Sequence, residues 1–203
     1  MPGEFWNERY RQGGYLYGEK PNEFLSHRHT LIPKDSRVLV LGDGEGRNGV
    51  FLARKRCQVT TIDASEVAVE KAKALAKTNN VEINAIHGVL PKVEIEKGVW
   101  DAVVLIFVHL SEKTRKATHR LAVEALKPGG LLILEAYTPE QLGNTSGGPK
   151  DAKLLYTAEM LKEDFEGLDI EAIAELETVL DEGPGHQGKA NVVRIIAVKP
   201  EED

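Results

Sequence analysis

Residues 38–49 read VLVLGDGEGRNG, a short apolar run followed by a loop rich in glycine. About 20 residues further on, Asp63 ends a second apolar run. This arrangement is typical of a nucleoside-binding crevice. Glycines let backbone amides approach a ligand closely, and a carboxylate after the next strand can accept hydrogen bonds from a ribose diol. The sequence therefore predicts that the functional site is one crevice at the ends of these strands.

The composition is that of one domain of ordinary size. The chain has 203 residues, a formal net charge of −6 and one cysteine, Cys57. The negative charge argues against nucleic acid as a partner, because phosphate binding depends on clustered Lys and Arg. No apolar run is long enough for a membrane span or a signal sequence, so we expect a cytoplasmic protein with no membrane partner. We expect Cys57 to be buried and inert, and scattered histidines predict no metal site.

From residue 37 onward, β-branched runs alternate with segments rich in Ala, Lys, Glu and Leu, which is typical of a parallel sheet flanked by helices. The expected strands are residues 37–41, 59–63, 84–87, 102–108, 131–137, 169–176 and 192–198. The expected helices are residues 48–56, 65–78, 111–126 and 158–165, with Ser65, Ser111 and Thr157 as N-caps. The predicted fold class is α/β, a Rossmann-like doubly wound sheet of seven strands, mostly parallel, with an antiparallel C-terminal hairpin strand.

The irregular stretches lie outside this pattern. Residues 138–151 have little periodicity, and loops of this length are often lids over a functional site. Residues 181–189 separate the last two strands without a helix. An aromatic-rich segment precedes the first strand and contributes no obvious strand of its own.

The glycine loop fits two registers. Residues 44–49 match the dinucleotide fingerprint G-x-G-x-x-G, whereas residues 42–46 match the looser G-x-G-x-G loop of S-adenosylmethionine enzymes. Further along, Trp100-Asp101 opens a strand and residues 127–130 read KPGG just before another. On these residues, from 37 to 199, the chain resembles the class I S-adenosylmethionine-dependent methyltransferases, a family whose sheet carries an antiparallel hairpin at its edge.

Four shorter motifs resemble one branch of that family, the tellurite-resistance methyltransferases, which are similar to the thiopurine S-methyltransferases. These motifs are FWNERY at 5–10, YGEKPN at 17–22, GEGRN at 44–48 and EGPGHQG at 182–188. The resemblance implies a single methyltransferase domain over residues 1–203, with an N-terminal lid segment, 1–36, and a Rossmann-like core, 37–199. It also implies S-adenosylmethionine as the cofactor and a small molecule as the methyl acceptor.

The resemblance assigns cofactor contacts residue by residue. Gly42, Gly44 and Gly46 would line the methionine half, and Asp63 would bind the ribose. Ala64 and Ser65 would flank the adenine, Val89 and Leu90 would border its ring, and Ile106 would contribute backbone to the floor. Trp6, Tyr10 and Tyr17 would close over the cofactor, although an aromatic stripe of this kind is also typical of core packing.

The chain departs from the family at the first strand. Val40 stands where an acid usually helps to bind the cofactor's ammonium group, and Asp43 stands where a small residue is common. We hypothesise that Asp43 supplies the missing charge, because a cationic ligand binds poorly without an anion. The residues HGVL at 87–90 also lack the Asp that often accepts from the adenine amino group.

Three residues are candidates for the substrate side: His109, His186 and Tyr137. His109 follows the fourth strand and could equally be a structural histidine, while Arg47 is either an anion-binding or a solvated surface residue. No secure acid–base pair is visible. This favours a soft nucleophile such as a thiol, a thiopurine or a chalcogen oxyanion, because such acceptors react without strong base help. We expect a monomer or a weak homodimer.

Two other functions stay open from the sequence. The second glycine register would fit an NAD-type dinucleotide-dependent oxidoreductase, although little chain remains for a hydride site. Val40 leaves open a non-catalytic S-adenosylmethionine-binding protein.

Overall fold

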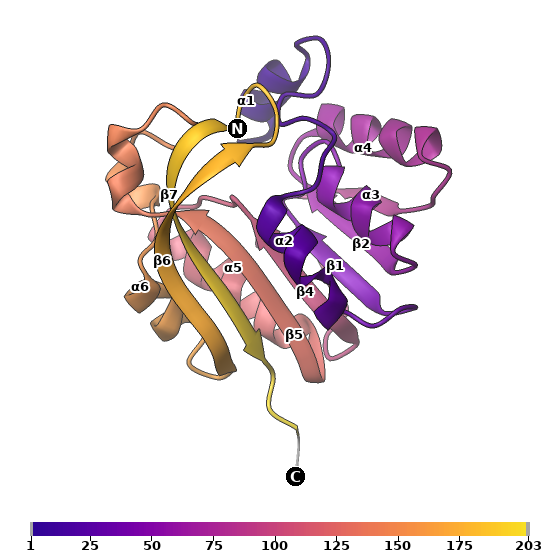
Figure 1. Ribbon diagram of the computed structural model, residues 1–203. Coiled ribbons are helices and arrows are strands. Elements are labelled where there is room, and N and C mark those ends of the chain that lie inside the picture. Colours follow the sequence, from indigo (N-terminus) through magenta and orange to yellow (C-terminus); the bar gives the residue numbers. More distant parts are fainter. Residues whose placement is uncertain (1, 202–203) are drawn as a thin grey trace.

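A seven-stranded sheet forms the centre of the computed structural model, which describes residues 2–201 (Figure 1). Its order is β3-β2-β1-β4-β5-β7-β6. The strands are β1 (Arg37–Leu41), β2 (Gln58–Asp63), β3 (Asn84–His87), β4 (Trp100–Ile106), β5 (Leu126–Tyr137), β6 (Asp169–Asp181) and β7 (Gln187–Val198). The strands from β1 to β5 pair in parallel, and β7 runs antiparallel to both β5 and β6. The predicted α/β class, strand number and hairpin are confirmed.

Helices cover both faces of the sheet. They are α1 (Pro2–Tyr10), α2 (Glu23–Arg28), α3 (Arg47–Arg54), α4 (Glu66–Thr78), α5 (Glu112–Ala125) and α6 (Ala158–Asp164), with short 3-10 turns at His29–Leu31, Pro139–Gly143 and Ala152–Leu154. Because side chains alternate along a strand, Val38 and Val40 pack in the layer of α2 and α3, whereas Leu39 and Leu41 pack in the layer of α5 and α6. Both faces of β1 are therefore buried, as is typical of a central parallel strand.

The predicted N-caps had different outcomes. Ser65 accepts a hydrogen bond from the backbone of Ala68 at 3.1 Å, so its capping role is confirmed. Thr157 likewise accepts from the backbone of α6. Ser111 lies at the N-cap position of α5 as predicted, but its hydroxyl pairs with the side chain of Thr114 at 3.0 Å and makes no capping hydrogen bond.

Some element boundaries also differ from the prediction. β6 and β7 reach further into the expected loop than predicted, because their ladder extends to the pair Asp181 and Gln187 and leaves only residues 182–186 as the turn. β5 begins at Leu126, which pairs with Trp100 ahead of the KPGG turn. The helices α1 and α2 were not expected.

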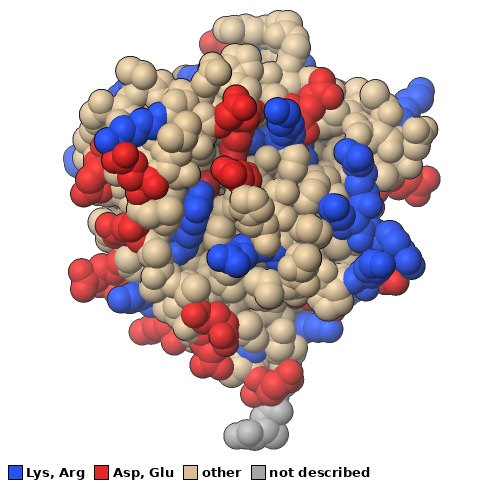
Figure 2. All heavy atoms as spheres, viewed as in Figure 1, with Lys and Arg blue, Asp and Glu red and all other residues tan. Residues whose placement is uncertain are grey.

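The predicted crevice end of the sheet is covered by two segments far apart in the sequence. Figure 1 shows α1 and the tip of the β6–β7 hairpin at the same end of the molecule, and Gly185 donates to the carbonyl of Leu16 at 2.8 Å. The face seen in Figure 2 carries Lys, Arg, Asp and Glu side by side rather than in one block of a single charge. Within residues 2–201, no helix combines the length and apolar character needed to cross a membrane.

Candidate functional site

The glycine loop after β1 is a cradle whose backbone conformation favours glycine. Gly42, Gly44 and Gly46 have φ angles of 67°, 58° and 92°, in the left-handed region that residues with a Cβ rarely adopt. A Cβ on Gly42 would lie 2.7 Å from Cγ2 of Val108, and one on Gly44 would lie 2.8 Å from the hydroxyl oxygen of Tyr10. The loop therefore lies between Val108, which follows β4, and Tyr10 of the N-terminal helix.

Asp63 lies at the carboxyl end of β2 and faces this cradle. Its Oδ2 accepts from the backbone N–H of Gly44 at 2.9 Å, and its Oδ1 accepts from that of Ser65 at 2.9 Å. Burial raises the pKa of Asp63, although these hydrogen bonds oppose the effect. Each carboxylate oxygen can accept a further hydrogen bond, so the side chain has the position and the capacity to bind a diol.

Asp43 is buried and bonded to the start of α3, and the hypothesis that it supplies charge to a ligand stays a prediction. Its Oδ2 and Oδ1 accept from the backbone N–H of Gly49 at 3.1 and 3.4 Å, so the side chain caps the start of α3. Burial raises its pKa to about 8. The raised pKa reduces the charge that Asp43 carries at neutral pH in the absence of a cationic ligand.

The pH dependence of stability tests this role of Asp43. Its folded pKa, about 8, lies above the unfolded value, so its contribution to stability is present below about pH 4 and is lost as the pH rises through 8. Asp43→Asn stays neutral and keeps an acceptor for Gly49. Between about pH 4 and pH 8, the parent should lose stability as the pH rises and the variant should not. The difference in the free energy of unfolding should therefore grow in favour of the variant by up to about 1.4 kcal/mol per pH unit. Urea unfolding at several pH values measures this, and a constant difference would contradict it.

The N-terminal helix lies over the loop that follows β2. Oδ1 of Asn7 accepts from the hydroxyl of Ser65 at 2.6 Å, which fixes α1 against the start of α4. Trp6 stacks on Tyr10 with ring centroids 5.5 Å apart, and Tyr10 meets Tyr17 edge to face at 6.4 Å. Tyr10 is buried, so these aromatic residues form a continuous row that both covers the cradle and packs against it.

The residues expected around an adenine lie at the edge of the same region. The carbonyl oxygen of Ala64 is 3.1 Å from Nε2 of His87. Val89 is 36% exposed, whereas Leu90 packs against the core on the α5 side. Val89 is therefore the more accessible of the two for contact with a ring.

Phe107 follows Ile106 at the end of β4 and was not among the predicted site residues. Its φ is 55°, in the left-handed region that bulky residues rarely adopt. Its ring stacks on Tyr137 at 4.4 Å and meets His186 edge to face at 4.6 Å. The side chain of Ile106 is buried in the core, and the contribution of its backbone to a cofactor site stays a prediction.

His109 and Tyr137 both have hydrogen-bond partners within the protein, and their catalytic role stays a prediction. Nδ1 of His109 lies 2.7 Å from the carbonyl of Leu154, and its Nε2 accepts from the backbone N–H of Tyr137 at 3.2 Å. Both ring nitrogens are thus occupied, and burial lowers the pKa of His109 to about 4. The phenol of Tyr137 is buried, donates to the carbonyl of Ser146 and has a raised pKa.

His186 is the remaining substrate-side candidate and lies in the β6–β7 turn. Its ring packs on Tyr17 with centroids 4.2 Å apart, and its Nδ1 lies 3.5 Å from Oε2 of Glu182. The same Oε2 is 2.7 Å from Nη2 of Arg47, and both side chains are buried. Arg47 is therefore neither a solvated surface residue nor an anion site in this structure, because Glu182 already neutralises it.

Two residues of the GEGRN motif, Glu45 and Asn48, bind the N-terminal segment. Glu45 accepts from the backbone of Leu16 at 2.7 Å and pairs with Lys71 at 2.7 Å. Oδ1 of Asn48 accepts from the backbone of Asn22 at 2.9 Å. The motif therefore holds residues 16–22 over the sheet.

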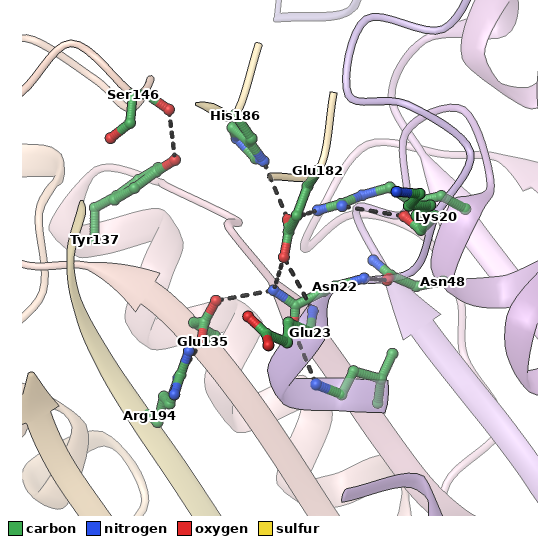
Figure 3. A network of polar contacts seen from close by, with 12 residues as sticks. Lys20, Asn22, Glu23, Asn48, Glu135, Tyr137, Ser146, Glu182, His186 and Arg194 are labelled. Carbon is green, nitrogen blue, oxygen red and sulfur yellow. Dashed lines mark hydrogen bonds and ion pairs between the residues drawn. The ribbon is translucent and has the colours of Figure 1, made fainter. Parts of the chain in front are cut away.

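Asn22 joins this segment to the hairpin (Figure 3). Its Nδ2 donates to Oε1 of Glu135 and to Oε1 of Glu182, both at 2.9 Å. Glu135 in turn pairs with Arg194 of β7. Asn22, Glu135 and Arg194 were not among the predicted site residues. The one signal in the sequence was that the motifs YGEKPN, GEGRN and EGPGHQG occur together in one chain.

The residues present fit S-adenosylmethionine at its nucleoside end. A left-handed glycine cradle lies beside a carboxylate with free acceptor capacity, and a row of aromatic rings offers faces to a sulfonium cation. Val40 is buried and apolar, so an ammonium group would rely on backbone carbonyls. Among the residues described, no three His, Cys, Asp or Glu side chains group as metal ligands.

Comparisons with known proteins agree with this geometry. Residues 38–130 match a family model described as a methyltransferase domain. The chain is 32% identical over 99 residues to a ubiquinone biosynthesis O-methyltransferase of Rickettsia akari (strain Hartford), covering 48% of this chain and 38% of the relative. It is 31% identical over 112 residues to a tRNA (uracil(54)-C(5))-methyltransferase of Pyrococcus horikoshii, covering 50% and 26%. The chain thus spans less than half the length of these curated relatives.

Among solved structures, TehB from Haemophilus influenzae superposes with a TM-score of 0.72. The two are 18% identical, and the match covers 97% of this chain and 66% of TehB. At this identity the likeness concerns the fold.

Proposed function

We propose that the chain, in which residues 38–130 match a methyltransferase domain and whose fold is similar to that of TehB, transfers a methyl group from S-adenosylmethionine to a small-molecule acceptor. The observation that carries the proposal is the cradle of residues 42–46, with Asp63 bonded across it to the N–H of Gly44. Loop and carboxylate meet at the carboxyl ends of β1 and β2, where ligands bind in open α/β sheets.

The bound cofactor supplies an electrophilic methyl group on a sulfonium sulfur. The chain's own residues position it: Asp63 holds the ribose, the glycine cradle admits the methionine half, and Phe107 lines the wall toward the acceptor. In this proposal residues 1–36 are a lid segment over the core, 37–199, because α1 and residues 16–22 cover the cradle. Excluding water and fixing the geometry supply most of the catalysis of an in-line displacement.

A small, soft acceptor is the class that the site favours. His109 and Tyr137 are committed to structural contacts, which leaves His186 as the only candidate proton acceptor among the three substrate-side residues. Aromatic rings of Tyr17, Phe107 and His186 crowd this end of the sheet. The mixed charge seen in Figure 2 and the net charge of −6 weigh against an RNA acceptor.

Calorimetry and a turnover assay test the proposal. S-adenosylhomocysteine should bind and NAD should not. The reverse would support a dinucleotide-dependent oxidoreductase. With radiolabelled methyl donor, we expect product from at least one of thiols, thiopurines, tellurite and selenite. If only a phenol or only tRNA is methylated, the proposed class of soft, small acceptors is wrong. Binding of S-adenosylhomocysteine without turnover of any acceptor would support a non-catalytic cofactor-binding protein.

A further inference from the structure

The turn between β6 and β7 contains a buried acid and a buried histidine that face each other. Glu182 is 4% exposed and His186 is 5% exposed. Oε2 of Glu182 and Nδ1 of His186 are 3.5 Å apart, and neither atom forms a well-aligned hydrogen bond with any residue in the described part of the chain. Arg47 lies 2.7 Å from the same Oε2 as an ion pair. Two facing buried polar atoms without well-formed bonds require an explanation.

The carboxylate of Glu182 is fixed in its orientation. Its Oε1 accepts from Nδ2 of Asn22 at 2.9 Å and from the backbone N–H of Glu23 at 3.0 Å, so Oε2 is held toward the histidine (Figure 3). Burial acts to raise the pKa of Glu182, but the contacts with His186 and Arg47 outweigh it and lower the pKa to about 2. The side chain is therefore a carboxylate at any working pH, and a carboxylate can only accept.

This arrangement determines the tautomer of His186. An acceptor facing Nδ1 favours the neutral ring with its proton on Nδ1, which leaves a lone pair on Nε2. The ring is held between Tyr17 and Phe107, and no group within residues 2–201 hydrogen-bonds to Nε2. Phe107 follows β4 next to Val108, which contacts the glycine cradle, so the histidine lies at the methyl-transfer end of the site.

We propose that Glu182 is a positioning residue that orients His186 to take a proton through Nε2, and that the methyl acceptor is a small thiol that enters the site protonated. This inference rests on the proposed function. As the thiol sulfur forms its bond to the methyl carbon, its proton moves to Nε2. The bond between that carbon and the sulfonium sulfur breaks, and its electron pair stays on the departing sulfur.

The electrostatic surroundings favour a thiol over an alcohol or a phenol. Burial lowers the pKa of His186, and Arg47 lowers it further, whereas Glu182 opposes them. The other titratable groups around the ring are Tyr17, Tyr137 and His109, all of which are neutral near pH 7. A weak base can accept a proton only from a comparatively acidic group. Thiols, with a pKa of about 8.5, are more acidic than phenols, with a pKa of about 10.

Nitrogen NMR of the side chain tests the positioning role without any acceptor. In the unsubstituted protein with S-adenosylhomocysteine, long-range proton–nitrogen correlations should show His186 with its proton on Nδ1. Glu182→Gln should shift the titration of His186 to lower pH and weaken this preference, since the amide can also donate. Glu135→Gln is the matched control, because it removes another buried carboxylate bonded to Asn22 but does not face His186.

Kinetics with an alkyl thiol such as 2-mercaptoethanol, which is protonated near pH 7, test the chemical role. Glu182→Gln should lower kcat by about 10- to 100-fold with little change in KM, and should move the acidic limb of the pH profile to lower pH. Three results would overturn the proposal: a proton on Nε2 in the unsubstituted protein, an equal NMR response in Glu135→Gln, or turnover of tellurite but of no thiol. If the unsubstituted protein does not bind S-adenosylhomocysteine, the proposed function itself is refuted.

Discussion

Replacing Asp164 with Asn is expected to lower the free energy of unfolding by about 3–5 kcal/mol. Oδ2 of Asp164 accepts from Nε of Arg115 and is in contact with Nδ1 of His119, both at 2.7 Å, and all three side chains are almost fully buried between α5 and α6. Burial acts to raise the pKa of Asp164, but these two partners outweigh it and lower the pKa. An amide cannot neutralise Arg115, so the variant would leave a buried, unpaired cation.

Urea unfolding followed by circular dichroism at pH 7 measures this loss. Glu112→Gln is the control, since it removes a carboxylate from an exposed pair with Lys116 on the same helix and should change stability little. Because the folded pKa of Asp164 is lowered, its contribution is present above the unfolded pKa and is lost as the pH falls through the folded value. Equal effects of the two substitutions would show that Arg115 has another source of compensation.

Replacing Asp63 with Ala should weaken binding of S-adenosylhomocysteine by about 100-fold, which corresponds to about 2.7 kcal/mol. The carboxylate would bind a ribose diol through hydrogen bonds to a charged group, and it also ties the N–H of Gly44 to β2 at 2.9 Å. Both the direct contact and the shape of the cradle are lost in the variant. Titration calorimetry at constant salt gives the affinity.

Asp101→Ala provides the matched control for Asp63. Asp101 is also a strand carboxylate that accepts a backbone hydrogen bond, from Arg37 at 2.7 Å, and it also pairs with Lys127. It lies at the amino end of β4, away from the cradle. We expect Asp101→Ala to reduce stability and to leave the affinity unchanged, so a similar affinity loss in both variants would mean that Asp63 acts only through the fold.

The strands and the cradle could be predicted because their signals are local. An apolar run of β-branched residues predicts a strand wherever it lies, and glycines at 42, 44 and 46 predict a loop whose backbone conformation favours glycine. Asp63 was found for the same reason, since the carboxyl ends of neighbouring parallel strands lie at one edge of the sheet. The burial of Asp43 and its bond to Gly49 could not be predicted, because its position in the loop does not reveal which way its side chain turns.

The N-terminal helix illustrates a different limit. Residues 2–10 carry no apolar face that would predict a helix, and α1 is held by contacts such as that between Asn7 and Ser65, which lie 58 residues apart in the sequence. A helix this short is marginal in isolation, so tertiary packing decides whether it forms.

By itself, the sequence determined the sheet, the glycine cradle and the carboxylate beside it, because backbone sterics and the periodicity of side chains act over a few residues. The tertiary structure decided which polar side chains lie together. Asn22 and Glu182 are 160 residues apart and yet share a hydrogen bond, and His109 and His186 differ only in the partners that folding brings to their rings. The burial and charge around each group exist only once the distant segments have packed together, and these set its tautomer and its pKa.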